Sequence, residues 1–410
     1  MTIRTDEHLP ATGTAPSGGT SAHAGAGRLY FLDWVRIIAF FLLIVYHTGM
    51  YYVSWDWHVK SPHAGEAIEP FMMMSSPWRL GLLFLVSGAA TAFLLRKSQQ
   101  GGTAAPLSFV RLRSWRLLLP LIVGMFVVVP PQPYLEVVEK VAYAGSFADF
   151  MRLYVAGYGG FCREDCLVLP TWNHLWFVAY LWTYSMLLWL GLRLAGDRAE
   201  GAAARLAGWL RGWRALLLPA LALGGVRVAL VARFPSTHDL VNDWYNHAQY
   251  LPLFAAGFLL ARQPAFWRTA EALRWPALAT AIGCWAAWVA YVFAFSEFHP
   301  PPDALRMAVR VGYGFLQWGA MLAACGFARR HLDRDGPARR YLVPAVFPVY
   351  IFHQTIIVVL AHHLKPAGMP PVAEGIVLVA ATFVLCFALY GVVKRVAWLR
   401  PLFGLGPLLR

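Results

Sequence analysis

The chain has 410 residues, of which 59% are hydrophobic and only 14% are charged. Soluble domains are about 45–50% apolar and about 25% charged, so this composition excludes an ordinary water-soluble globule. A mean hydropathy of +0.51 agrees. The net charge of +14 does not by itself indicate a nucleic-acid partner, because basic residues in a membrane protein first report its topology. Five Cys without a CxxC pair exclude a disulfide-rich scaffold and give no sign of structural zinc.

The first segment, residues 1–27, is rich in Gly, Ala, Ser and Thr and has no periodic apolar pattern, which predicts a disordered cytoplasmic tail. We see no basic region followed by a short apolar run and a cleavage site, so we expect an uncleaved first span and no signal peptide. Residues 28–400 are expected to form one membrane domain. Residues 401–410 are expected to be a short cytoplasmic C-terminal tail.

A membrane-spanning helix needs about 20 predominantly apolar residues. The sixth such stretch is short and opens with Asn246 and His247. We therefore predict an all-α polytopic membrane protein with ten transmembrane helices, at 31–52, 71–95, 115–133, 173–194, 214–234, 246–263, 274–297, 306–328, 342–363 and 373–393.

The distribution of basic residues predicts the orientation of these spans. If the N-terminal tail is cytoplasmic, the inner segments hold 24 Lys and Arg and the outer segments hold 6. Because basic residues concentrate on the cytoplasmic side, we expect both termini to be cytoplasmic. The outer loop 134–172 is expected to contain one surface helix over 135–154. Cys162 and Cys166 in this loop either pair, in an oxidising compartment, or stay as two thiols.

The first span contains three ionisable residues, Asp33, Arg36 and His47. At 100° per residue they share one face of the helix, so this face must line a protein interior or a channel rather than lipid. Asp33 and Arg36 are close enough to pair, whereas Arg36 and His47 lie about 16 Å apart along the axis. A single His in a span is either a hydrogen-bonded structural group or a proton-transfer group.

Other cations also lack an obvious partner. Arg79, Arg227 and Arg310 lie in spans that contain no clear carboxylate, so either backbone carbonyls and water satisfy them or an anionic ligand does. The inner loop with Arg113 and Arg116 is either a topological stop for the third span or an anion site, since two Arg spaced i,i+3 face the same way on a helix.

Two further clusters have alternative explanations. The segment Asn173-His174-Leu175-Trp176-Phe177 opens the fourth span, where aromatic residues also collect at membrane interfaces. The segment Tyr350-Ile351-Phe352-His353-Gln354 lies within the ninth span, where polar residues also form hydrogen bonds between helices.

Taken together, these residues resemble a known family. The spacing of Arg36 and His47, with ten residues between them, is similar to the Arg-x10-His signature of the membrane acyltransferase-3 family. The resemblance extends over about residues 28–400. Five more elements agree in order: Trp57-His58-Val59 with Ser61, Arg79 ahead of Leu83-Phe84-Leu85-Val86-Ser87-Gly88, Arg113 and Arg116 before Pro120, His174-Leu175-Trp176-Phe177, and Tyr350-Ile351-Phe352-His353-Gln354. The Trp-His-Val element and the Arg before Ser-Gly look closest to the branch that succinylates osmoregulated periplasmic glucans.

The resemblance implies an O-acyltransferase of the bacterial inner membrane, a multi-pass protein in contact with membrane lipid. It would take a succinyl or acetyl group from cytoplasmic acyl-CoA, its donor substrate, to a periplasmic or cell-surface glycan. It implies no permanently bound cofactor, no metal and no nucleic acid, and it leaves the oligomeric state open. The implied catalytic residues are His47 as general base, with Arg36 and Asp33. The implied substrate-binding residues are Arg111, Arg113 and Arg116 for the donor's phosphates, with Arg79, His58, His174, Trp176 and His353.

Two rival functions are a proton-coupled membrane exporter and a non-catalytic partner in polysaccharide assembly. The exporter predicts coupling carboxylates in mid-membrane, and Asp33 alone lies clearly inside a span. The non-catalytic partner would not need the acyltransferase signature to be intact. No Cys or Ser is clearly a nucleophile, so we expect direct transfer without an acyl-enzyme.

Overall fold

A computed structural model describes residues 29–99, 105–163, 166–196, 198–296 and 298–406. The tail predicted for residues 1–27 lies outside the described residues. Within them the secondary structure is helical, apart from one isolated β-bridge between Cys162 and Cys166, so the predicted all-α fold is confirmed. The α-helices run in chain order as α1 (Tyr30–Met50), α2 (Glu69–Ser75), α3 (Arg79–Gln99), α4 (Ala105–Val123), α5 (Pro131–Val141), α6 (Phe147–Ala156), α7 (Trp176–Ala195), α8 (Arg198–Trp209), α9 (Arg214–Leu230), α10 (Trp244–Leu260), α11 (Pro264–Ala272), α12 (Arg274–Ala294), α13 (Asp303–Leu332), α14 (Pro337–Leu364), α15 (Pro371–Arg395) and α16 (Leu399–Leu402).

Seven helices in the described part of the chain are long and apolar enough to cross a membrane, or up to nine if each of two bent pairs is one span. The bent pairs are the α4 region with α5, at 41°, and α8 with α9, at 104°. All ten predicted stretches fall mainly on helices, but α10 has only 17 residues and contains Pro252. The structure thus shows a multi-span helical protein, and the count of ten remains a prediction.

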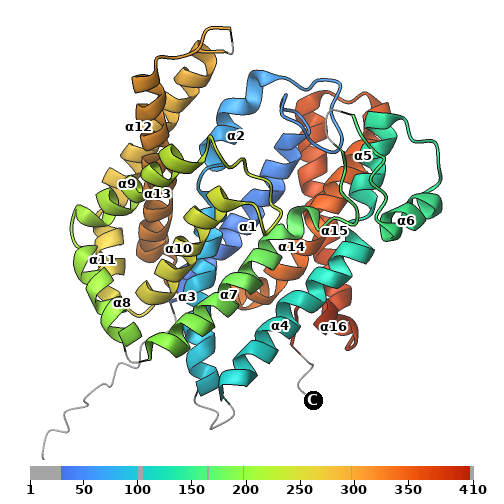
Figure 1. Ribbon diagram of the computed structural model, residues 1–410. Helices are drawn as coiled ribbons and strands as arrows, with labels where there is room; N and C mark the ends of the chain where they lie inside the picture. Colours follow the sequence, from blue (N-terminus) through green and yellow to red (C-terminus); the bar gives the residue numbers. More distant parts are fainter. Residues whose placement is uncertain (1–28, 100–104, 164–165, 197, 297, 407–410) are drawn as a thin grey trace, which may run out of the picture.

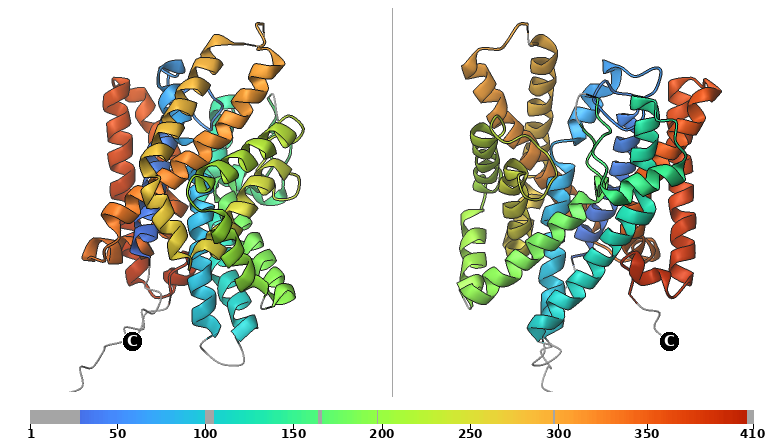
Figure 2. Two further views of the ribbon diagram at one scale, coloured as in Figure 1. Left: turned by 90° about the vertical axis from the view of Figure 1, so that its left-hand side faces the viewer. Right: turned by 45° about the vertical axis from the view of Figure 1, so that its right-hand side comes forward.

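Helix α1 lies in the middle of the bundle and packs against α3, α13, α14 and α15 (Figure 1). The α12–α13 pair and α15 stand at opposite edges, as the right-hand view of Figure 2 shows. The central position of α1 explains why its polar face is shielded from lipid.

Two glycines allow α3 and α10 to pack with their backbones in close approach. A Cβ atom on Gly88 would lie 1.9 Å from the backbone oxygen of Phe254, and one on Gly257 would lie 1.9 Å from that of Leu85. No side chain fits at such distances, so glycine at both positions sets the separation of the two helices. Gly88 of the sequence motif therefore lies on the face of α3 that meets α10.

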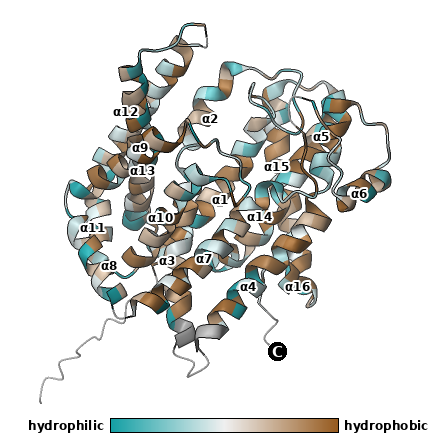
Figure 3. Ribbon diagram, viewed as in Figure 1, coloured by the Kyte–Doolittle hydropathy of each residue, from teal (hydrophilic) through white to brown (hydrophobic). Residues whose placement is uncertain are grey.

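Helices at the edges of the bundle present apolar residues outward. Only 11% of the apolar window of α12 and 28% of that of α15 is buried inside the protein. Exposed side chains there include Ile282 and Phe293 on α12 and Val384 on α15. Hydrophobic residues run along most of α15 in Figure 3. These faces are suited to contact with lipid.

The outer loop differs from its prediction. The single surface helix expected over 135–154 is wrong, because α5 ends at Val141 and Ala142 follows in a left-handed conformation with φ 53°. Ser146 then starts α6 by accepting a hydrogen bond from the Asp149 amide. Cys162 and Cys166 are joined by a disulfide bond, so of the two alternatives left open by the sequence, the structure has the paired one.

Candidate active site

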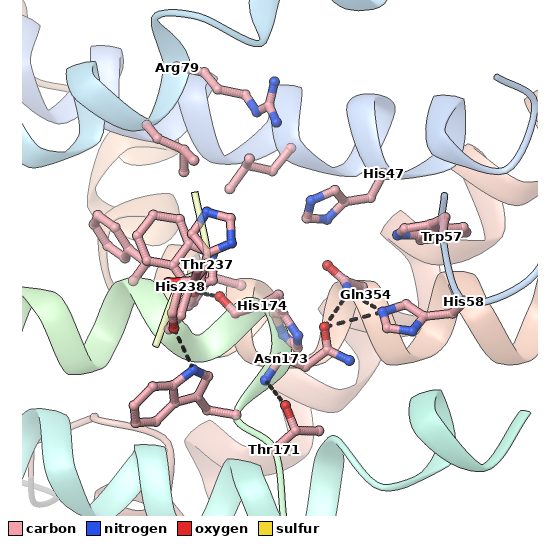
Figure 4. Close-up of a pocket in the computed structure, with 16 residues that line it drawn as sticks. His47, Trp57, His58, Arg79, Thr171, Asn173, His174, Thr237, His238 and Gln354 are labelled. Carbon is pink, nitrogen blue, oxygen red and sulfur yellow. Dashed lines mark hydrogen bonds between the residues drawn. The ribbon is translucent and has the colours of Figure 1, made fainter. Parts of the chain in front are cut away.

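A cavity of about 340 Å³ lies at the C-terminal end of α1 and contains most of the predicted site residues. We call it the outer cavity. Arg79 and His47 face it from one side, and His58, Asn173, His174 and Gln354 from the other (Figure 4). Its lining comprises Leu43, His47, Trp57, His58, Arg79, Leu80, Thr171, Trp172, Asn173, His174, Trp176, Phe177, Thr237, His238, Tyr350 and Gln354.

His47 is held by a second histidine. Its Nδ1 lies 2.9 Å from Nε2 of His353, and the two rings stack with centroids 5.0 Å apart. Nδ1 of His353 lies 2.6 Å from the backbone oxygen of Tyr350, so it must donate its hydrogen there. Nε2 of the neutral His353 ring is then an acceptor, and His47 donates to it from Nδ1. This assignment leaves a lone pair on Nε2 of His47, an atom that makes no hydrogen bond with any described residue.

His58 is engaged on both ring nitrogens. Nδ1 pairs with the Glu136 carboxylate at 2.5 Å, and Lys140 donates to the other carboxylate oxygen at 2.8 Å. Nε2 lies 3.2 Å from Oδ1 of Asn173 and 3.1 Å from Nε2 of Gln354. His58 therefore fixes one wall of the outer cavity, and neither of its nitrogens is free to act as a base in this arrangement.

His174 is likewise fully used. Its Nε2 donates to the backbone oxygen of Ile351 at 3.1 Å, and Nδ1 accepts from Gln132 at 3.4 Å. Gln132 also accepts a hydrogen bond from Gln354 at 3.0 Å. The amide side chains thus connect α5, the 3-10 turn before α7 (Asn173–Leu175) and α14 into one polar network. Of the histidines His47, His58, His174 and His353, His47 alone keeps an unused ring nitrogen within the described residues.

Arg79 brings a buried positive charge to the same cavity. Its side chain is only 6% exposed, and its guanidinium lies 3.1 Å from the centre of the Tyr46 ring. Nε and Nη1 are buried and make no hydrogen bond with any described residue. Backbone carbonyls, one of the explanations open at the sequence level, therefore do not satisfy these two atoms. An unpaired guanidinium that borders a cavity favours an anionic ligand.

Trp176 forms the far wall by stacking on His238, with ring centroids 4.2 Å apart. His238 belongs to the loop between α9 and α10, where Asp243 accepts its backbone N–H at 3.1 Å. Burial lowers the pKa of His238, while the charge of Asp243 acts in the opposite direction. Sequence reasoning missed this residue, because a single His in a polar loop carries no pattern.

Glu136 was also missed as a site residue. It lies in the outer loop 134–172, and its pairing with His58 joins residues 78 apart in the sequence. The only local signal is Lys140 four residues later, which indicates an ordinary ion pair on a helix.

A second cavity, of about 660 Å³, lies at the N-terminal end of α1, and we call it the inner cavity. Arg113 lines it and donates to Ser185 at 2.9 Å and to Thr91 at 3.2 Å, neither of which neutralises its charge. Arg111 is exposed and lines neither cavity. The inner cavity is lined by Leu29, Leu32, Asp33, Arg36, Phe40, Val86, Ser87, Ala90, Phe93, Arg113, Arg116, Leu117, Phe177, Leu181, Val343, Pro344, Val346, Phe347, Gly404, Leu405 and Gly406.

Asp33 and Arg36 belong to the inner cavity and not to the surroundings of His47. The two are 3.7 Å apart, as their spacing predicts. Asp33 also pairs with Arg339 of α14 at 2.5 Å, so it joins two helices. Because 14 residues of helix separate Asp33 from His47, about 21 Å along the axis, this carboxylate does not orient the His47 ring.

The two cavities adjoin. Phe177 lines both of them, while Phe40 and Leu43, one turn apart on α1, line one each. At the boundary the Phe40 ring lies 6.3 Å from Phe177 and 5.2 Å from Tyr350, between ring centroids. Three aromatic rings thus lie between the two cavities, which are at opposite ends of α1.

Long apolar helices around two cavities and the half-buried His47 define a multi-span membrane protein. A family model described as an acyltransferase domain, that of acyltransferase 3, matches residues 29–391. The chain therefore belongs to the acyltransferase-3 family, and it is a membrane acyltransferase. No curated protein and no solved structure matches it.

Proposed function

We propose that the protein transfers an acyl group from acyl-CoA to a hydroxyl group of a glycan outside the cytoplasm. The observation that carries this proposal is the pair of adjoining cavities along α1, one with Arg113 and Arg116 and the other with His47. Guanidinium groups in the inner cavity suit the phosphates of CoA, because Arg–phosphate hydrogen bonds are charge-assisted. The polar, aromatic-walled outer cavity suits a sugar.

In this mechanism His47 is the general base. Its Nε2 takes the proton of the glycan hydroxyl, and the oxygen attacks the carbonyl carbon of the thioester. When the tetrahedral intermediate collapses, the carbon–sulfur bond breaks and the CoA sulfur leaves with the proton from His47. His353 fixes the tautomer that makes Nε2 basic. The step needs no acyl-enzyme.

The direction of transfer rests on the topology. We propose ten spans with both termini cytoplasmic, in the bacterial inner membrane, because Lys and Arg alternate so strongly between the segments that join the helices. The inner cavity then opens toward the cytoplasm, where acyl-CoA is found. The disulfide between Cys162 and Cys166 lies in a segment that this topology places outside the cytoplasm. Disulfides persist in oxidising compartments, so the bond is consistent with this orientation.

For the acyl group we propose succinyl, with acetyl as the alternative, and for the acceptor an osmoregulated periplasmic glucan. A succinyl group ends in a carboxylate, and Arg79 offers two buried N–H groups without partners. Arg79 lines the outer cavity and not the inner one, which favours this role over a contact with the donor's phosphates. An acetyl group would leave the guanidinium without a counter-charge.

The test is acyl transfer by the purified protein in detergent, with succinyl-CoA or acetyl-CoA and a periplasmic glucan, followed by mass spectrometry of the glucan. The proposal predicts an added mass of one acyl group and release of one CoA for each acyl group added. An exporter would bind the glucan without consuming thioester, and a non-catalytic partner would do neither. Either result, with protein shown to be folded, would refute the proposal that the two cavities form the active site of an acyltransferase.

A further inference from the structure

A third cavity, separate from the two along α1, is lined by three arginines. It has a volume of about 300 Å³ and lies between α9, α12 and α13. None of its lining residues is acidic. They are Arg227, Val231, Trp288, Tyr291, Arg306, Val309, Arg310 and Tyr313.

Among the described residues, a carboxylate pairs with only one of these three arginines. Arg227 lies 3.5 Å from the centre of the Tyr313 ring and donates to the Tyr245 hydroxyl at 2.7 Å, both neutral partners. Arg310 makes no hydrogen bond or ion pair with any described residue. Arg306 pairs at 3.1 Å with Asp303, whose side chain is 90% exposed. Arg227 and Arg310 thus pair with no carboxylate of the described residues, and half-buried guanidinium groups favour an anion as their partner.

The position of the cavity indicates which kind of anion. Arg306 and Arg310 lie in the first turns of α13, and Arg227 lies in the last turn of α9. Both helix ends border segments that we assign to the outer side, where Lys and Arg are otherwise rare. Helix α12, which supplies Trp288 and Tyr291, is the least buried of the candidate spans. On this topology the arginines belong at the outer membrane interface, beside the candidate span with the most exposed apolar window.

We propose that this cavity binds the phosphate of a membrane lipid, with the arginines on the phosphate oxygens and the acyl chains along the exposed apolar face of α12. Tyr291 and Trp288 suit this depth, because aromatic rings with one polar group prefer the membrane interface. The site is independent of the proposed acyl transfer: it shares no lining residue with the outer or the inner cavity.

The test uses the full-length protein purified in detergent, with phosphatidylglycerol as the probe and native mass spectrometry to measure bound lipid. Arg310→Gln removes a guanidinium that has no partner in the described part of the protein, so it should not disturb folding. We expect it to raise the Kd for phosphatidylglycerol at least tenfold, about the effect of losing one charge-assisted hydrogen bond. Arg306→Gln should act in the same direction.

The matched control is Arg233→Gln, which removes an exposed arginine just beyond the same end of α9 but outside the cavity. It should leave lipid binding unchanged. Inorganic phosphate and glycerol 3-phosphate form a second arm and should not compete at the lipid's concentration. Unchanged binding in Arg310→Gln, or an equal loss in Arg233→Gln, would overturn the site. Competition by inorganic phosphate at the lipid's own concentration would show that the site binds free phosphate rather than a lipid headgroup.

Discussion

At the scale of single residues, His47 carries its hydrogen on Nδ1 because two hydrogen bonds in series fix it. The backbone oxygen of Tyr350 takes the Nδ1 hydrogen of His353, and Nε2 of His353 takes that of His47. Burial of His353, which is 1% exposed, keeps water from competing for either bond. The account therefore assigns proton transfer to His47 and positioning to His353.

Variants at this pair should separate the two roles. His47→Ala should lower the rate of acyl transfer about 10²–10⁴-fold, the usual contribution of a proton-transfer group. His353→Leu should lower kcat less than His47→Ala does, because the His47 ring loses the hydrogen bond that orients it. KM should stay nearly unchanged, because His353 does not contact the substrate. His353→Gln should restore part of kcat, since an amide can accept from His47 and donate to Tyr350. His363→Ala, an exposed His on the same helix, is the control. Equal activity in His47→Ala and wild type would remove His47 from the mechanism.

A variant of Arg79 tests the proposed succinyl group. Arg79→Met keeps most of the side-chain volume and removes the charge, so it should reduce succinyl transfer far more than acetyl transfer. The measurement is kcat/KM for both donors in wild type and variant. If both donors lose equally, Arg79 does not read the acyl carboxylate, and acetylation becomes the simpler hypothesis.

Some of these residues could be predicted from the sequence and some could not. The helical period places Asp33, Arg36 and His47 on one face, and the structure has that face lining both cavities. The helical period does not reveal that Asp33 pairs with Arg339, or that His47 contacts a histidine 306 residues away. Such contacts depend on how helices pack, which a periodic pattern in one helix does not encode.

At the scale of elements, α3 and α10 approach each other closely at two glycines, while α1 packs against both α3 and α14. Phe254 and Leu85 offer their backbone oxygens where Gly88 and Gly257 lack side chains. Small residues at such contacts are typical of helices in membranes. Ser87, next to Gly88, lines the inner cavity.

Replacing these glycines should be costly only at the helix contact. We expect Gly88→Ala to destabilise the protein by about 1–3 kcal/mol, as overpacking does, since its Cβ would meet backbone that cannot rotate away. Gly283→Ala on α12 is the control, because no atom lies within 4 Å of the added carbon there. Thermal unfolding in detergent measures both. A lower midpoint for Gly283→Ala than for Gly88→Ala would contradict the packing account.

Apolar runs were sufficient to predict that these elements are helices but not how each one ends. The predicted span at 246–263 is a 17-residue helix, and that at 214–234 continues from α8 through a bend of 104°. The helix expected over 135–154 is broken at Ala142, a residue that rarely adopts a left-handed conformation. These features arise from contacts and turns that hydropathy does not report.

At the scale of the whole molecule, function depends on which cavity faces which side of the membrane. The family match establishes an acyltransferase, while the orientation rests on the distribution of charges. Arg113 and Arg116 lie on one side of the three aromatic rings, and His47 lies on the other. The proposed donor, acyl-CoA, can reach these arginines only if the inner cavity faces the cytoplasm.

Reporter fusions test this orientation. Fusions at residues 101 and 336 should report a cytoplasmic location, and a fusion at residue 160 should report an external one. The reason is the excess of Lys and Arg in the segments around the first two positions. An external signal at 101 would overturn the topology and, with it, the direction of transfer.

The most direct test of the account is acyl transfer across a sealed membrane. Proteoliposomes receive glycan outside and acyl-CoA either inside or outside, and the external glycan is analysed by mass spectrometry. Donor inside should give acylated glycan with wild-type protein and almost none with His47→Ala, whereas donor outside should give none with either. Equal acylation with donor and glycan on the same side of an intact membrane would contradict transfer between the two cavities.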